Sequence, residues 1–230
     1  MENNKLPASR MSKWESVFAI GWLPVHVLGL PALLLARLLP GLSAANLNFG
    51  LYVIGAFALS LLCLGFLRRD FDRLWEQPLS IIGTAVMGCL ALLGLNYILS
   101  ILLSILPASV FPDTNPNNEA VLDLVKSEKA RMVCTTLVLA PILEELMFRG
   151  GIFGLVRRKN RALAYVVCVL AFGVYHTWQY ALMDPAYWLN LVQYLPAGVL
   201  LCWCYEQTEC IWTSIFLHML FNGVSLWALL

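Results

Sequence analysis

The 230-residue chain is 60% hydrophobic and 13% charged, with a mean hydropathy of +0.75 and a formal net charge of +1. Soluble globular proteins are about 45–50% apolar and about 25% charged, so this chain has too few charged side chains to cover a water-facing surface. The composition argues against a soluble enzyme, a nucleic-acid-binding protein and a secreted domain held by disulfides. It indicates a polytopic membrane protein whose partners include membrane lipid and no nucleic acid.

Long apolar segments follow a short basic tail, residues 1–15. A helix needs about 20 apolar residues to cross a hydrocarbon core of about 30 Å. We therefore expect residues 16–230 to form a single all-α bundle embedded in the membrane, with about seven transmembrane helices in a range of six to eight. The predicted spans are residues 16–36, 50–67, 79–106, 132–156, 162–183, 187–205 and 210–229.

The distribution of Lys and Arg predicts a cytoplasmic N-terminus. Seven spans with that end inside place ten of the fifteen basic residues on the cytoplasmic side and four on the other side, with Arg149 inside a span. Cytoplasmic loops carry the excess of positive charge. We expect an integral protein of the cytoplasmic (plasma) membrane of a bacterium.

The fourth predicted span carries Glu144, Glu145 and Arg149 in an otherwise apolar helix. Each charge costs roughly 2.5–3.5 kcal/mol at the centre of a membrane helix, so such residues normally face a partner or an aqueous cavity. Glu145 precedes Arg149 by four residues, the favourable order for an ion pair on one helix face. Glu144 is left without a partner in its own helix, which makes it a candidate general acid or base. The alternative is that all three form a structural ion network.

Three polar residues of later spans fall at a depth similar to that of Glu144. At about 1.5 Å per residue from the cytoplasmic loops, Glu144, His176 and Asn222 lie roughly 20 Å deep and His218 roughly 14 Å deep. The short loop 157–161 makes the fourth and fifth spans an antiparallel hairpin, which allows Glu144 and His176 to face one another. We therefore predict one site formed by Glu144, His176, His218 and Asn222.

Two other features of the sequence are expected to contribute to helix packing and not to the predicted site. His26, in the first span, has no polar neighbour at helical spacing and is predicted to be a packed or interfacial histidine. The seven cysteines lie in or at the ends of apolar stretches, where cysteine usually acts as a small hydrophobic residue.

The predicted site has the groups needed for hydrolysis of a peptide bond without a Ser or Cys nucleophile. A carboxylate and an imidazole that flank a water molecule can deprotonate it and return the proton to a leaving amine. A second imidazole beside an amide can donate hydrogen bonds to a developing oxyanion. Glu144, His176 and His218 could instead ligate zinc, because catalytic zinc sites commonly use two His and one carboxylate. The chain has no His-Glu-x-x-His motif.

Three motifs occur in order on successive apolar segments: Glu144-Glu145-x-x-x-Arg149, Phe172-x-x-x-His176 and His218-x-x-x-Asn222. Together they resemble the CPBP family of intramembrane proteases, which includes the type II CaaX prenyl endopeptidases and bacterial proteins of the Abi group. The resemblance covers residues 132–230, the expected catalytic core.

By this resemblance, Glu144 activates water with the help of His176. The oxyanion site is lined by His218 and Asn222. Glu145 and Arg149 are a supporting pair. The family has been described both as metalloproteases and as metal-independent glutamate proteases. The His and Asn pair fits an oxyanion role, which favours a site with no cofactor over one that holds zinc through Glu144, His176 and His218.

The expected function is that of a membrane-embedded hydrolase, an endopeptidase that acts on a membrane-associated or lipidated peptide or protein. The alternative is a non-proteolytic, Abi-like immunity or scaffold protein that retains the bundle. A transporter is a third hypothesis because intramembrane acids also carry protons. The absence of visible repeat halves in the sequence argues against a transporter.

Overall fold

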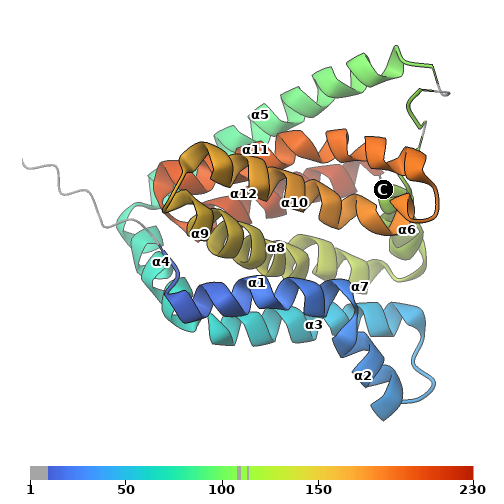
Figure 1. The fold of residues 1–230 in the computed structure, drawn as a ribbon, viewed down its shortest axis with the longest axis horizontal. Helices are drawn as coiled ribbons and strands as arrows, with labels where there is room; N and C mark the ends of the chain where they lie inside the picture. Colours follow the sequence, from blue (N-terminus) through green and yellow to red (C-terminus); the bar gives the residue numbers. More distant parts are fainter. Residues whose placement is uncertain (1–9, 108–109, 113, 230) are drawn as a thin grey trace, which may run out of the picture.

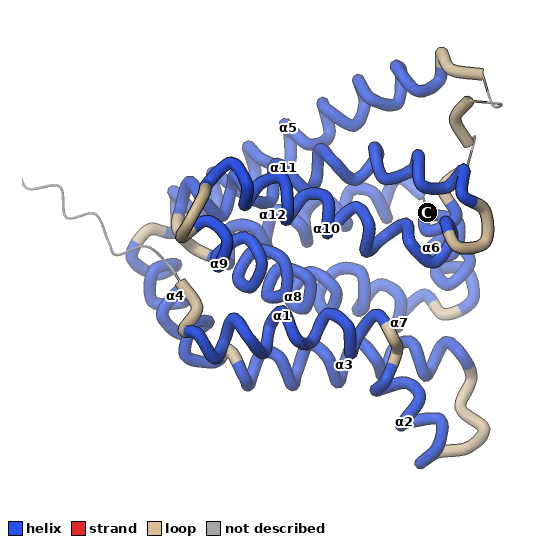
Figure 2. Tube along the Cα trace, in the orientation of Figure 1, coloured by secondary structure: helices blue, strands red, loops and turns tan. Residues whose placement is uncertain are grey.

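The computed structural model describes residues 10–107, 110–112 and 114–229. All regular elements among these residues are helices, which confirms the prediction of an all-α bundle. Most helices run along one long axis and pack side by side, whereas α2 (Leu30–Leu38) and the end of α5 (Pro78–Ser104) diverge from the bundle (Figure 1). Figure 2 shows the same arrangement coloured by secondary structure.

The N-terminal half contains α1 (Lys13–Val27), α2, α3 (Ala44–Leu62), α4 (Leu64–Glu76) and α5. A capping box formed by Ser12 and Glu15 starts α1, because each residue pairs with an otherwise unpaired backbone N–H of the other. Gly29 has φ +63° between α1 and α2, a conformation that costs glycine little. The two helices meet at 59°, so the first predicted span is a bent pair and not one straight helix.

The C-terminal half begins with α6 (Pro116–Ser127) and then stays helical from residue 129 to residue 157. This long stretch consists of α7 (Lys129–Cys134), η1 (Thr135–Leu139), α8 (Ala140–Glu145), η2 (Leu146–Phe153) and α9 (Gly154–Arg157), of which η1 and η2 are π-helical. The chain then forms α10 (Arg161–Ala181), the 3₁₀-helix η3 (Pro185–Tyr194), α11 (Leu195–Thr208) and α12 (Ile211–Leu229).

Among the described residues, four helices are long and apolar enough to cross a membrane: α3, α5, α10 and residues 211–228 of α12. The bent pair α1–α2 makes a fifth if it counts as one span. The segment predicted as the span 187–205 is not one long α-helix in the structure. The 3₁₀-helix η3 forms its first half, and α11 has only 14 residues. The stretch 129–157 is divided by its π-helical turns into short elements. The number seven therefore stays a prediction.

Basic residues from distant parts of the sequence gather at one end of the bundle, where α4 and α9 lie at the left of Figure 1. Three ion pairs tie the chain together here: Arg69 with Glu15, Arg157 with Glu209, and Arg161 with Glu206. Arg161 donates to both carboxylate oxygens of Glu206 at 2.8 Å and holds the pKa of this carboxyl below its usual range. The loops that the charge count assigns to the cytoplasm thus share one end of the molecule.

We expect Gly88→Ala to destabilise the bundle. A Cβ at this position of α5 would fall inside the contact radii of Leu217 Cδ1 and Cys204 Sγ, because α5 packs closely against α11 and α12 here. Overpacking of this kind costs about 1–3 kcal/mol, which should lower the midpoint of thermal unfolding in detergent. Gly83→Ala, on the same helix with no atom within 4 Å of the added Cβ, is the control. Equal midpoints for the two variants would contradict the close packing.

Candidate active site

Glu144 and Glu145 occupy the last two positions of α8, between the π-helical segments η1 and η2. Both carboxylates are buried, with 3% and 0% of the residue surface exposed. Short π-helical turns inside α-helices are rare and occur frequently at functional sites. The local backbone therefore departs from regular helix on both sides of the two acids.

Glu145 and Arg149 form the ion pair that their spacing predicts. Arg149 Nη1 lies 3.0 Å from Glu145 Oε1, and both side chains are fully buried. The guanidinium also lies over the Phe172 ring, 4.4 Å from its centroid, and its Nη2 donates to the Gly198 carbonyl at 3.5 Å. The pair therefore connects η2 to α10 and α11.

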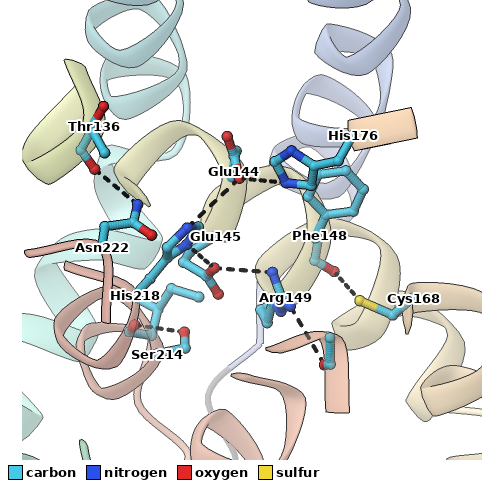
Figure 3. A network of polar contacts seen from close by, with 12 residues as sticks. Thr136, Glu144, Glu145, Phe148, Arg149, Cys168, His176, Ser214, His218 and Asn222 are labelled. Atoms are coloured by element: carbon cyan, nitrogen blue, oxygen red, sulfur yellow. Dashed lines mark hydrogen bonds and ion pairs between the residues drawn. The ribbon is translucent and has the colours of Figure 1, made fainter. Parts of the chain in front are cut away.

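Glu145 also holds His218, a contact that the sequence did not reveal. His218 Nδ1 lies 2.8 Å from Glu145 Oε1. Because a carboxylate only accepts hydrogen bonds, Nδ1 carries the proton and donates it to Glu145. The supporting ion pair thus fixes the orientation of one predicted site histidine and leaves its Nε2 atom facing Glu144 (Figure 3).

Glu144 has no partner within its own helix, as expected, and its partners come from α10 and α12 instead. Glu144 Oε2 lies 3.6 Å from His176 Nε2 and 3.9 Å from His218 Nε2 (Figure 3). This oxygen is buried and makes no hydrogen bond. Both distances exceed the roughly 2.6–3.2 Å of a catalytic hydrogen bond, and such contacts often tighten only when substrate binds. The structure therefore brings Glu144, His176 and His218 to one point.

Aromatic side chains hold the His176 ring in place. Tyr194 stacks on it with centroids 4.7 Å apart and 8° between the planes, and Phe172 meets it edge-on at 4.7 Å. The Tyr194 hydroxyl accepts a hydrogen bond from Asn115 Nδ2 at 3.1 Å. Tyr194 therefore links the loop before α6 to the site. Nothing in the sequence distinguishes it from the other tyrosines.

Asn222 lies one turn after His218 on α12 and does not join the Glu144 cluster directly. Its Nδ2 donates to the Thr136 carbonyl of η1 at 2.9 Å. A side-chain amide has two N–H donors, so the second is available for another acceptor. Asn222 lines the same cavity as Glu144, His176 and His218, which keeps it within the candidate site.

The site opens into a cavity of about 920 Å³. His26 is packed as predicted, 5% exposed and edge-on to Tyr52 at 4.9 Å between ring centroids. It also lines this cavity, a position that the sequence did not suggest. The packing of α1 against α3 and η2 determines its place, and no local motif marks it.

The two imidazoles and one carboxylate have the right chemistry for zinc, and in this structure they lie slightly farther apart than the ligands of a metal-bound site. Ligands at about 2.0–2.1 Å from a tetrahedral zinc lie about 3.3 Å from one another. The two His Nε2 atoms lie 3.6 and 3.9 Å from Glu144 Oε2. Among the described residues, no three His, Cys, Asp or Glu side chains are arranged to hold a metal ion.

The family-model match falls on the part of the chain that holds Glu144, His176, His218 and Asn222. Residues 126–224 match the family model described as Type II CAAX prenyl endopeptidase Rce1-like. A Bacillus subtilis (strain 168) protein, described as "Putative membrane peptidase YdiL", is 31% identical over 107 residues. The match spans 46% of this chain and 40% of that protein. No solved structure matches the chain. The resemblance carried by the three motifs is confirmed for this segment.

Proposed function

We propose that the chain is an intramembrane endopeptidase that hydrolyses a peptide bond of a membrane-associated or lipidated peptide or protein. The observation that carries this proposal is the convergence of two imidazoles on one buried, unpaired oxygen of Glu144, next to a large cavity. The six residues of the three motifs that bear this chemistry all lie within the segment similar to the Rce1-like family.

In the proposed reaction, a water molecule lies between Glu144 and His176. Glu144 accepts a proton as the water oxygen attacks the scissile carbonyl carbon, which gives a tetrahedral intermediate with a negatively charged oxygen. The same proton then passes to the leaving nitrogen, assisted by His176, and the C–N bond breaks. The products are a carboxylic acid and an amine, as expected for general acid–base catalysis by a positioned carboxylate and imidazole.

His218 and Asn222 would bind the oxyanion. Since His218 Nδ1 already donates to Glu145, its Nε2 can donate only when the imidazole is doubly protonated. The second N–H of Asn222 supplies another donor. Donors aimed at the developing charge usually make one of the largest contributions to catalysis.

Tyr194 is expected to position His176 through ring stacking. Tyr194→Leu removes the stack and should lower kcat by roughly tenfold to a hundredfold with little change in KM, because His176 would no longer be held in its productive orientation. Tyr194→Phe keeps the ring and loses only the hydrogen bonds of the hydroxyl with Asn115 Nδ2 and Oδ1, so it should retain most of kcat. Steady-state kinetics of the two variants test this, and equal losses would show that the hydroxyl matters rather than the stack.

For the membrane arrangement we propose seven crossings with the basic end in the cytoplasm, in the plasma membrane of a bacterium. The gathering of the basic loops at one end supports this orientation. In this arrangement α7 to α9 cross as one span, and η3 with α11 as another. Residues 16–230 would then form one bundle with its catalytic core in residues 132–230.

The test of the proposed function uses purified protein in lipid nanodiscs, with matched prenylated and unprenylated peptides, with and without a strong chelator. We expect cleavage of at least one peptide class at a rate that the chelator does not change. Loss of activity with chelator and its return with zinc would replace the glutamate mechanism with a metal-dependent one. Absence of cleavage in both peptide classes would contradict the proposed function.

A further inference from the structure

Both halves of the chain build the wall of the cavity that contains Glu144. Besides the site residues of α8, α10 and α12, the wall includes His26 of α1 and Asn96 of α5. These two residues lie outside residues 126–224, the segment similar to the Rce1-like family. The N-terminal half is therefore part of the cavity and more than a support for the motif-bearing helices.

Three wall residues each carry a buried polar atom that has no hydrogen-bond partner: His26 Nδ1, Asn96 Oδ1 and Thr136 Oγ1. Buried polar atoms in folded proteins nearly always have partners, so unpaired ones beside a cavity indicate that a ligand or water completes them. An imidazole, an amide and a hydroxyl can pair with the N–H and C=O groups of a peptide main chain. His26 of α1 and Asn96 of α5 lie on opposite sides of the motif-bearing helices (Figure 1), and Thr136 belongs to η1, so this main-chain-binding chemistry is spread over the cavity wall.

The same wall carries almost no formal charge. Among its described residues, Glu144 is the one Asp, Glu, Lys or Arg side chain, and the other polar groups are histidines, amides and hydroxyls. A buried charge is strongly unfavourable unless it is paired. On the part of the wall that His26 and Asn96 supply, a charged substrate residue or a free C-terminal carboxylate would find no Lys or Arg partner, and His218 already contacts Glu145 and Glu144.

Leucine side chains of the N-terminal helices also line the cavity. They are Leu51 of α3 and Leu92, Leu99 and Leu103 of α5. Binding pockets for small ligands and peptides combine such apolar surface with a few polar groups that fix orientation. Apolar side chains of a bound segment would pack against these leucines while its main chain pairs with the unpaired polar atoms.

On the basis of the proposed endopeptidase function, we propose that His26 and Asn96 supply two separate contact points of a subsite that binds the main chain of an extended, uncharged peptide segment. The residues on both sides of the scissile bond would then carry no Asp, Glu, Lys or Arg, and a free C-terminal carboxylate would not bind in this subsite. The N-terminal half thereby determines which peptide segment reaches Glu144.

Binding is measured with the Glu144→Gln protein in nanodiscs, so that no turnover occurs. The probe is a short fluorescent peptide of Ala, Leu and Ser with both ends blocked, followed by fluorescence anisotropy. We expect His26→Phe and Asn96→Leu each to weaken binding by about threefold to tenfold, the effect of losing one hydrogen bond. Methylation of the central amide nitrogens of the peptide should weaken its binding to the parent protein. The same methylation should weaken binding to the Asn96→Leu variant less, because that variant already lacks the Asn96 side-chain oxygen.

Two control variants each remove a buried oxygen that has no hydrogen-bond partner and does not line the cavity, Ser16 Oγ and Asn190 Oδ1, and the second also removes the bond from Asn190 Nδ2 to the Thr114 carbonyl. Ser16→Ala lies on α1, as His26 does, and Asn190→Leu makes the same change as Asn96→Leu. Both should bind the probe with the affinity of the parent. Loss of affinity in these controls equal to that in the subsite variants would show a general structural effect and overturn the proposal.

A second set of probes tests charge. The same peptide with a central Asp, a central Lys or a free carboxylate in place of the blocked end should bind at least about tenfold more weakly, because each would bury an unpaired charge. Equal binding of charged and uncharged peptides would overturn the proposal, as would normal affinity in both His26→Phe and Asn96→Leu. If the uncharged peptide binds as described but the wild-type protein does not cleave it, the subsite stands and the proposed function fails.

Discussion

Replacement of Glu144 by Gln is expected to lower kcat by about 10²- to 10⁴-fold, the contribution typical of a positioned general acid–base group. Gln keeps the shape of the side chain but cannot accept the proton of the attacking water. KM should change little, because the cavity and the two histidines remain in place. Rates of peptide cleavage by the purified variant in nanodiscs measure both parameters.

Glu119→Gln is the matched control for this substitution. Glu119 lies in the first turn of α6 on the exposed surface, so the same chemical change there should leave kcat and KM unaltered. A Glu144→Gln protein that cleaves peptide at the wild-type rate would contradict the mechanism. It would also favour a role for the bundle as an immunity or scaffold protein.

Replacement of Arg149 by Met is expected to destabilise the protein by about 3–5 kcal/mol, the cost of breaking a buried ion pair by removing one partner. Both side chains of the Glu145–Arg149 pair are fully buried, so Glu145 would lose its guanidinium partner and keep only the contact with His218. A shift of the unfolding midpoint in mixed detergent micelles measures the loss. Activity should also fall, since Glu145 orients His218.

A double variant distinguishes the unpaired charge from the lost packing of Arg149. Glu145→Gln combined with Arg149→Met removes both charges, and the Gln side-chain oxygen can still accept the hydrogen bond from His218 Nδ1. The double variant should therefore be more stable than Arg149→Met alone. If it is less stable, the contacts of Arg149 with Phe172 and Gly198 contribute more than the ion pair.

Local spacing in the sequence was sufficient to predict the contacts made within one helix. The four-residue interval predicted the pairing of Glu145 with Arg149, and the structure has this ion pair although η2 is π-helical. Depth counted along the spans also predicted that Glu144 and His176 face one another. The length of the charge-free apolar segments predicted an all-helical protein, because each approaches the roughly 20 residues that a helix needs to cross a bilayer.

Contacts between helices could not be predicted in the same way. The bond from His218 to Glu145, the stacking of Tyr194 on His176 and the place of His26 in the cavity wall all depend on how separate helices pack. No spacing rule relates such residues. The first span bends at Gly29, which adopts a left-handed conformation. The apolar pattern of the sequence likewise does not show that residues 185–194 form the 3₁₀-helix η3.

The central claim is that water, activated at Glu144, cleaves the peptide without a covalent intermediate on the protein. Mass spectrometry of the purified wild-type chain, quenched while it turns over a membrane-associated peptide, tests this most directly. The proposed mechanism predicts two peptide fragments whose masses sum to that of the substrate plus one water molecule, together with an unmodified protein chain. An intact substrate after prolonged incubation, or a protein chain carrying the acyl fragment of the peptide, would contradict it.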